Sequence, residues 1–158
     1  MLSACSSKDK CEKIKDEKRL VINFDDSVTI IRELLKSDSL TQILDDHDPE
    51  KLDFLINNFS PAEIAFESEV SECTLPVVIY FYEQKNDVLE WVEYLALKYQ
   101  NAIKVLLING NNFPQITNNV EITEYPTVLV IKNKIEIARI SKQAINSQNI
   151  EDIIEQIK

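Results

Sequence analysis

Residues 122–133 read Ile-Thr-Glu-Tyr-Pro-Thr-Val-Leu-Val-Ile-Lys-Asn, and this stretch decides the fold that the sequence predicts. The run from Thr127 to Lys132 is β-branched and apolar, which is typical of a buried strand. A second run of the same kind, residues 135–140, follows after only Asn133 and Lys134. So short a connection predicts an antiparallel hairpin.

The residues before the hairpin predict a pair of parallel strands. Val77–Tyr82 is a continuous apolar run, as expected of a strand that is covered on both faces. Residues 87–99 carry one apolar stripe at helical spacing, and residues 103–108 form the next apolar run. A strand, a helix and a strand in this order form a right-handed crossover, which makes the two strands parallel. The sequence also predicts a short helix at Pro114–Asn119 and a last helix capped by Asn146 or Ser147.

The order βαβ, α, β-hairpin, α is that of thioredoxin, and residues 122–133 resemble the segment in which that family has an Ile-Pro-Thr motif. In the family this proline is cis and lies beside the active site, so we expect a cis bond between Tyr125 and Pro126. Pro114 falls where the family has a proline that opens its third helix. The resemblance covers residues 76–158 and implies an α/β, thioredoxin-like fold.

The resemblance fails at the residues that carry thioredoxin chemistry. The family's Trp-Cys-Gly-Pro-Cys sequence lies at the start of the first long helix, where the helix N-terminus makes the first thiol more acidic and nucleophilic. The aligned residues here, 85–89, read Lys-Asn-Asp-Val-Leu. The family's buried acid falls at Tyr80, and its glycine after the hairpin falls at Lys142. The sequence therefore predicts a thioredoxin-like domain that is not a dithiol oxidoreductase.

What the resemblance leaves is the binding half of the thioredoxin site, where backbone beside the cis-proline pairs with an extended chain. The predicted role is a redox-inactive module that binds a protein or an extended peptide, as an adaptor or holdase, with no cofactor and no metal. For Tyr82 and Trp91 we favour a second interpretation, as aromatic residues of the core or of a sheet edge. The candidate groove residues are Tyr82, Asn86, Trp91, Phe113, Tyr125, Pro126 and Thr127.

The cysteines leave an enzymatic alternative open. A thioredoxin-fold protein could act as a one-cysteine reductase through Cys73 or Cys11, together with a partner's thiol. Cys73 precedes the first long strand, so it is expected at the N-terminal end of that strand, opposite the active-site edge. A surface or core thiol is the favoured interpretation of Cys73. A third hypothesis is a purely structural lipoprotein of the cell envelope.

Residues 1–19 are polar and charged without apolar periodicity, which predicts a disordered leader or tether. Within them, Leu2-Ser3-Ala4-Cys5 resembles a bacterial lipobox, which implies acylation of Cys5 and a place on the periplasmic side of the cell envelope. The basic and apolar parts of a secretion signal do not precede it. Either the true start lies upstream, or the match is accidental and the protein is cytoplasmic. Acylation of Cys5 would leave Cys11 and Cys73, which could pair in an oxidising compartment.

Residues 20–74 predict a mainly helical N-terminal extension that packs against the domain formed by residues 75–158. A short strand is expected at residues 20–24, and a helical pattern begins at Val28. Ser60-Pro61-Ala62-Glu63 has the form of a capping box, which starts a further helix.

Composition and single residues exclude several classes of function. The chain has 27 acidic and 17 basic residues, for a net charge of -10. Binding to nucleic acid needs clustered Lys and Arg, so nucleic acid is not an expected partner. Gly110 is the only glycine, so the glycine-rich loops that bind nucleotide phosphates cannot form. No apolar run is long enough to span a membrane, so membrane contact is expected only through a lipid on Cys5.

The only histidine, His47, lies among Asp45, Asp46 and Asp48, and such residues are ordinary ligands of divalent metals. Asp48 is already explained as a helix cap before Pro49. We therefore favour a solvated helix end over a metal site at His47.

Overall fold

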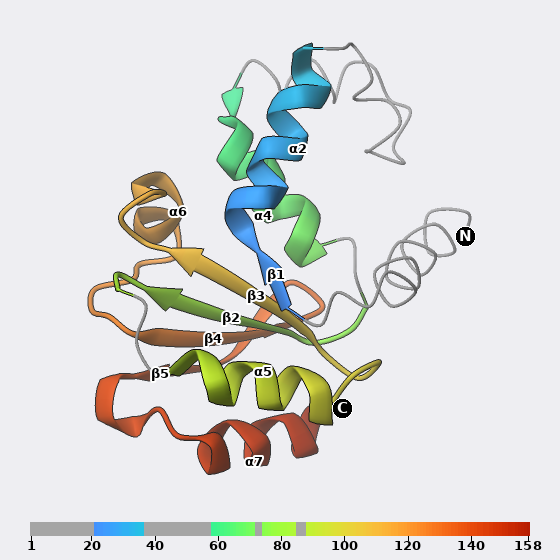
Figure 1. Cartoon of the computed structure of the whole chain (residues 1–158), viewed down its shortest axis with the longest axis vertical. Helices are drawn as coiled ribbons and strands as arrows, with labels where there is room; N and C mark the ends of the chain where they lie inside the picture. The colour runs from blue at the N-terminus through green and yellow to red at the C-terminus, as the bar shows by residue number, and fades with distance from the viewer. Residues whose placement is uncertain (1–20, 37–57, 72–73, 85–87) are drawn as a thin grey trace.

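The described part of the chain forms one five-stranded sheet with helices on both faces (Figure 1). The structure is a computed structural model, and it describes residues 21–36, 58–71, 74–84 and 88–158. The strand order is β1-β3-β2-β4-β5; β3 pairs in parallel with β1 and β2, whereas β4 pairs antiparallel with β2 and β5. The strands are β1 Val21–Asn23, β2 Val77–Tyr82, β3 Lys104–Asn109, β4 Thr127–Lys132 and β5 Ile135–Ser141. The helices are α2 Phe24–Lys36, α4 Pro61–Ser71, α5 Val88–Lys98, α6 Pro114–Asn119 and α7 Ser147–Ile157, with a short 3-10 helix η2 at Lys142–Ala144.

From residue 77 onwards the elements follow the predicted order βαβ, α, β-hairpin, α, so the α/β fold class is confirmed. At the hairpin turn, Asn133 and Lys134 have φ values of 52° and 67°, as a two-residue turn with the twist of a hairpin requires. Asn146 caps α7, because its side-chain oxygen accepts a hydrogen bond of 2.8 Å from the backbone N–H of Asn149.

The boundary between the first strand and the first helix differs from the one that the sequence pattern predicted. β1 ends at Asn23 and α2 begins at Phe24, one turn before the expected helical pattern at Val28. The side-chain oxygen of Asn23 accepts a hydrogen bond of 3.3 Å from the backbone N–H of Asp25, so Asn23 caps the helix. Asp25 and Asp26 lie in the first turn, where the helix dipole favours carboxylates. These acids continue the helix, whereas the sequence interpretation placed them at the boundary of the strand.

β1 belongs to the same sheet as the later strands. Val21 pairs with Val105 and Asn23 with Leu107 of β3, in a parallel register. The sheet therefore contains residues from both sides of position 75, and β1 is one of its two outermost strands.

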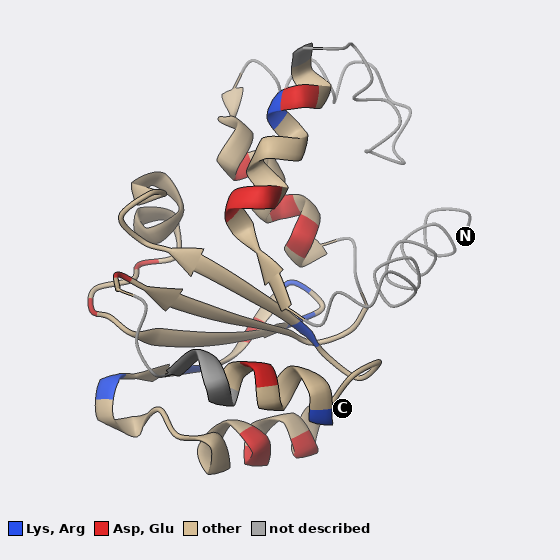
Figure 2. Cartoon of the chain, in the orientation of Figure 1, with Lys and Arg blue, Asp and Glu red and all other residues tan. Residues whose placement is uncertain are grey.

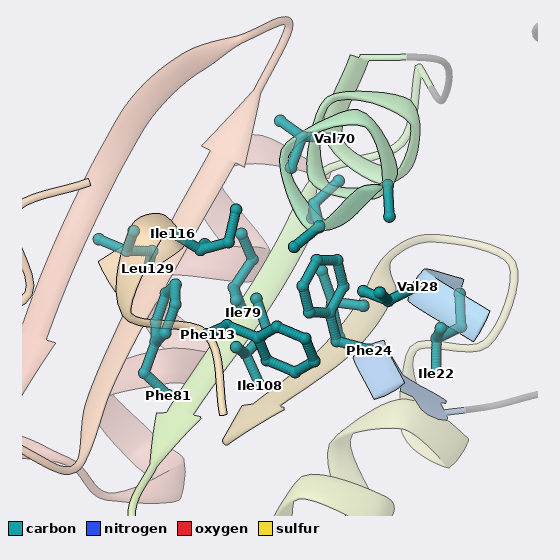
Figure 3. Packing of buried hydrophobic residues seen from close by; sticks show 14 of the residues in the cluster. Ile22, Phe24, Val28, Val70, Ile79, Phe81, Ile108, Phe113, Ile116 and Leu129 are labelled. Atoms are coloured by element: carbon teal, nitrogen blue, oxygen red, sulfur yellow. The ribbon is translucent and has the colours of Figure 1, made fainter. Parts of the chain in front are cut away.

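Strand β2 supplies side chains to a hydrophobic core on each face of the sheet. Ile79 and Phe81 belong to the core under α2, α4 and α6 (Figure 3). Val78 and Tyr80 belong to the core under α5 and α7. All six residues of β2 are buried, as its continuous apolar run predicted.

Phe24 joins α2 to the first of these cores. Its side chain is fully buried, and its ring meets that of Phe113 edge to face, with 4.8 Å between the centroids and 73° between the planes. The ring of Phe66 in α4 approaches from another side, at 6.3 Å and 85°. Such perpendicular pairs are favoured arrangements of aromatic rings, and here they tie two helices to the loop before α6. Figure 3 shows the pair of Phe24 and Phe113.

α4 is held to the sheet by a buried ion pair. Figure 2 shows acidic residues along α2 and α4, and one of them, Glu69, lies against the ammonium of Lys104 at the start of β3. Lys104 is only 6% exposed, and its ammonium also donates a hydrogen bond of 2.6 Å to the backbone oxygen of Glu69. The hydroxyl of Ser27 in α2 donates to the Glu69 carboxylate at 3.3 Å. One carboxylate thus connects α2, α4 and β3. The capping box of Ser60 and Glu63 that starts α4 is present as predicted, with both of its hydrogen bonds at 3.2 Å.

We predict that Glu69→Gln lowers the free energy of unfolding by about 2–3 kcal/mol, because it leaves the Lys104 ammonium buried without a counter-charge. Glu124→Gln is the matched control, since Glu124 pairs with Lys142 where both side chains are about half exposed, at 42% and 52%. That exposed pair should contribute about 0.5 kcal/mol or less. Urea unfolding followed by circular dichroism measures both variants. Equal losses in the two variants would contradict the importance of the buried pair.

Candidate functional site

The carboxyl ends of the parallel strands β1, β3 and β2 lie at one edge of the sheet (Figure 1). In open α/β sheets, ligands bind in the crevice outside this edge. β2 ends at Tyr82 and β3 at Asn109, and these two residues are register partners. The backbone N–H of Gly110 donates a hydrogen bond of 2.8 Å to the carbonyl of Tyr82, which carries the strand pairing one residue further.

The loop after β3 is a hydrogen-bonded turn. The side-chain oxygen of Asn109 accepts a hydrogen bond of 3.0 Å from the N–H of Asn111, and its carbonyl accepts one of 3.2 Å from the N–H of Asn112. Phe113 then turns its ring into the core, and Pro114 takes the first position of α6, where a missing N–H costs nothing. Phe113 was a candidate groove residue; the structure places it at 6% exposure, against Phe24.

Tyr125 lies directly on Gly110. A Cβ atom built at Gly110 would collide with the hydroxyl oxygen and two ring carbons of Tyr125. The backbone of Gly110 does not have a positive φ, so the requirement for glycine here is the close approach of the ring. Tyr125 and Pro126 are half-buried, and Tyr125 also packs against the first core. The peptide bond between them, expected to be cis, is cis.

Thr127 is buried beneath this corner. Its hydroxyl donates a hydrogen bond of 2.7 Å to the carbonyl of Glu124 and lies 3.1 Å from the hydroxyl of Ser141. The carbonyl of Pro126 accepts a hydrogen bond of 3.0 Å from the N–H of Lys142. Lys142, which aligns with a glycine in the thioredoxin family, has a φ of 49°, in the region that glycine adopts most easily. Thr127 therefore supports the Tyr125-Pro126 corner from below.

Tyr82 lies inside the second core. It is 7% exposed, and its ring stacks on that of Tyr80, with 5.9 Å between the centroids and 15° between the planes. Burial raises the pKa of Tyr80 to about 12, with a smaller contribution from Tyr82. Burial, and secondly the charge of Asp25, raise the pKa of Tyr82 above its usual value. Both phenols are therefore held neutral beneath the site.

The remaining predicted residues have no described placement. Asn86 and the side chain of Trp91 lie outside the described residues, as do Cys5, Cys11, Cys73 and His47. Within the ranges that the structure covers, no group of three or more His, Cys, Asp or Glu side chains could hold a metal ion. Among the helices described, none is long and apolar enough to cross a membrane.

Sequence reasoning overlooked the position of Gly110. It noted this residue only as the single glycine of the chain, which excluded nucleotide-binding loops. Any side chain at this position would require the ring of Tyr125 to shift. The contact with Tyr125, 15 residues later in the chain, could not be seen without the fold.

Comparison with solved structures concerns the fold of the chain. The crystal structure of thioredoxin O2 from Arabidopsis thaliana in the oxidised state matches with a TM-score of 0.51, over 60% of this chain and 88% of that chain. The chain has a thioredoxin-like fold. The two sequences are 17% identical, so the likeness concerns the fold alone. A structure of a malarial protein matches with a TM-score of 0.47 and 19% identity, over 52% of this chain and 96% of that chain. No family model and no curated protein matches this chain.

We predict that Gly110→Ala displaces the ring of Tyr125 and lowers the free energy of unfolding by about 1–3 kcal/mol, as overpacking does. In the Tyr125→Ala background the same change should cost at least about 1 kcal/mol less, because the colliding ring is gone. Chemical unfolding of both single variants and the double variant gives this coupling energy. Additive losses would show that Gly110 and Tyr125 do not depend on each other.

A second prediction concerns the buried phenol of Tyr80. Its pKa of about 12 in the folded state lies above the value of 10.0 expected in the unfolded chain. Between these two values the folded state keeps a proton that the unfolded chain releases, so stability is fully present below pH 10 and falls as the pH rises towards about 12. Tyr80→Phe should reduce this fall in urea-unfolding experiments. Tyr94→Phe, at a tyrosine that is 51% exposed, controls for the loss of one hydroxyl.

Proposed function

We propose that this protein is a redox-inactive thioredoxin-like module that binds extended segments of other proteins, as an adaptor or holdase. The observation that carries the proposal is the absence of cysteine from residue 74 to residue 158, the part that carries the thioredoxin resemblance. Residues 85–89, which align with the family's Trp-Cys-Gly-Pro-Cys sequence, read Lys-Asn-Asp-Val-Leu. Asn86 and Leu89 therefore stand at the two cysteine positions. An amide and an alkyl side chain cannot exchange a disulfide, because the attacking group must be a thiolate.

The binding role is supported by the corner around Tyr125. Tyr125 and Pro126 form a half-buried apolar surface at the carboxyl edge of the sheet, where α/β proteins bind ligands. The hydrogen bonds of Thr127 and Lys142 hold this surface rigidly from below. A rigid apolar corner beside the last residues of β2 suits an extended chain, which presents alternate side chains to a protein surface. Tyr82 acts on this site from within the core, through its carbonyl bond to Gly110.

The same proposal includes a tether. The residues Leu2-Ser3-Ala4-Cys5 support acylation of Cys5 and attachment to the periplasmic side of a bacterial membrane. Mass spectrometry of the protein from its native membrane, compared with a Cys5→Ser variant, tests the lipid directly. An unmodified Cys5 in the wild-type protein would contradict the tether and leave the binding module unaffected.

The redox part of the proposal predicts that the natural chain does not speed the cleavage of insulin disulfides above the dithiothreitol background. Fluorescently labelled insulin, whose emission rises on cleavage, measures this rate. Asn86→Cys with Leu89→Cys, in a chain whose three natural cysteines are serine, serves as the positive control, because it restores the family's pair. Weak activity is expected there, since Tyr80 replaces the assisting acid. Activity of the natural chain that disappears on Cys73→Ser or Cys11→Ser would instead establish the one-cysteine enzyme.

The binding part predicts that the protein suppresses the aggregation of insulin B chain after chemical reduction, measured by light scattering. Tyr125→Ala should lose most of this effect, because it removes the aromatic surface of the corner. Tyr94→Ala is the matched control, since Tyr94 is an exposed tyrosine on α5. Comparable losses in the two variants, or no suppression by the natural chain, would contradict a holdase site at Tyr125.

A further inference from the structure

Asn109 and Gly110 form a chemically reactive pair at the end of β3. In an Asn-Gly sequence the backbone nitrogen of glycine can attack the side-chain amide carbon of asparagine, because glycine has no side chain to hinder the approach. Gly110 is the only glycine, so this is the only Asn-Gly pair in the chain.

The fold engages both reacting groups in hydrogen bonds. The N–H of Gly110 is committed to the carbonyl of Tyr82, at 2.8 Å, and therefore points at the neighbouring strand. The side-chain oxygen of Asn109 is committed to the N–H of Asn111, at 3.0 Å, and its backbone carbonyl to the N–H of Asn112. Gly110 is buried, and the ring of Tyr125 lies over it. Attack requires the Gly110 N–H to leave the Tyr82 carbonyl and the Asn109 side chain to turn towards the freed nitrogen, which is a local opening of the sheet end.

We infer that Asn109 is a deamidation site that the fold keeps latent, and that it reacts when the end of β3 separates from β2. In the open state the Gly110 nitrogen forms a bond to the side-chain carbonyl carbon of Asn109. The amide C–N bond breaks, and ammonia leaves with the proton that the Gly110 nitrogen gives up. Water then hydrolyses either carbonyl of the cyclic imide, giving aspartate or isoaspartate. No atom changes its oxidation state, and water is the only co-reactant.

The product would alter the candidate site. Isoaspartate places an additional carbon in the main chain between residue 109 and Gly110, which moves the Gly110 N–H away from the Tyr82 carbonyl. Either product adds one negative charge at the carboxyl edge of the sheet. The displaced backbone would also lose the packing contact between Gly110 and the ring of Tyr125. An episode of local opening would thus be recorded as a permanent change at this corner.

Peptide mapping by mass spectrometry of the full chain, incubated at neutral pH and warm temperature, tests the inference. In denaturing urea, Asn109 should deamidate at least about tenfold faster than Asn133, which is followed by Lys134 and is the internal control. In buffer without urea, Asn109 should react at least about tenfold more slowly than it does in urea, because only the open fraction reacts. Equal rates with and without urea would overturn the protection, and equal rates at Asn109 and Asn133 in urea would overturn the site.

The variants Tyr125→Ala and Tyr94→Ala separate local from general effects. Tyr125→Ala uncovers Gly110 and should raise the rate at Asn109 several-fold in buffer, while Tyr94→Ala leaves it unchanged. The rate at Asn133 corrects for any general loss of stability in either variant. An unchanged rate in Tyr125→Ala would overturn the role of the ring as a cover. Gly110→Ala, measured in urea, should slow the reaction whether or not that variant folds. These outcomes do not depend on whether the corner binds a partner.

Discussion

The burial of strand β2 on both faces is the constraint on which the rest of the structure depends. Its six side chains alternate between two cores, so each face of the sheet must be covered by helices. Full burial of one such side chain contributes about 1.5–3 kcal/mol, and no other strand places every side chain inside among those described. Because β3 and β4 both pair with β2, the ends of these strands, and the loops that follow them, are positioned by it.

The candidate site depends on the same strand. The carbonyl of Tyr82, the last residue of β2, holds Gly110, and Gly110 in turn carries the ring of Tyr125. Thr127, the first residue of β4, pairs with Phe81, and its hydroxyl donates a hydrogen bond to the carbonyl of Glu124, just before the Tyr125-Pro126 bond. The corner is thus an extension of the hydrophobic core and has little freedom of its own. Among the described residues of the corner there is no cysteine.

A redox role and a packing role make opposite demands on position 80. A proton-transferring acid must exchange protons near neutral pH, whereas the phenol of Tyr80 keeps its proton up to a pH of about 12 because it is buried. The stacked rings of Tyr80 and Tyr82 fill space beneath the site with apolar surface. The side chains of Tyr80 and Tyr82 therefore contribute buried packing below this end of the sheet.

The sequence by itself determined the elements whose signals are local. The apolar runs of β2 and β4, the turn at Asn133 and the caps at Ser60 and Asn146 each depend on residues within a few positions of one another. Only the tertiary structure decided that Phe24 packs on Phe113, that Lys104 meets Glu69 and that Tyr125 rests on Gly110. Each of these is a contact between elements, and such a contact is set by what packs against a side chain from distant parts of the chain. A local pattern carries the period of a strand or helix, but it does not carry the identity of the neighbour across the core.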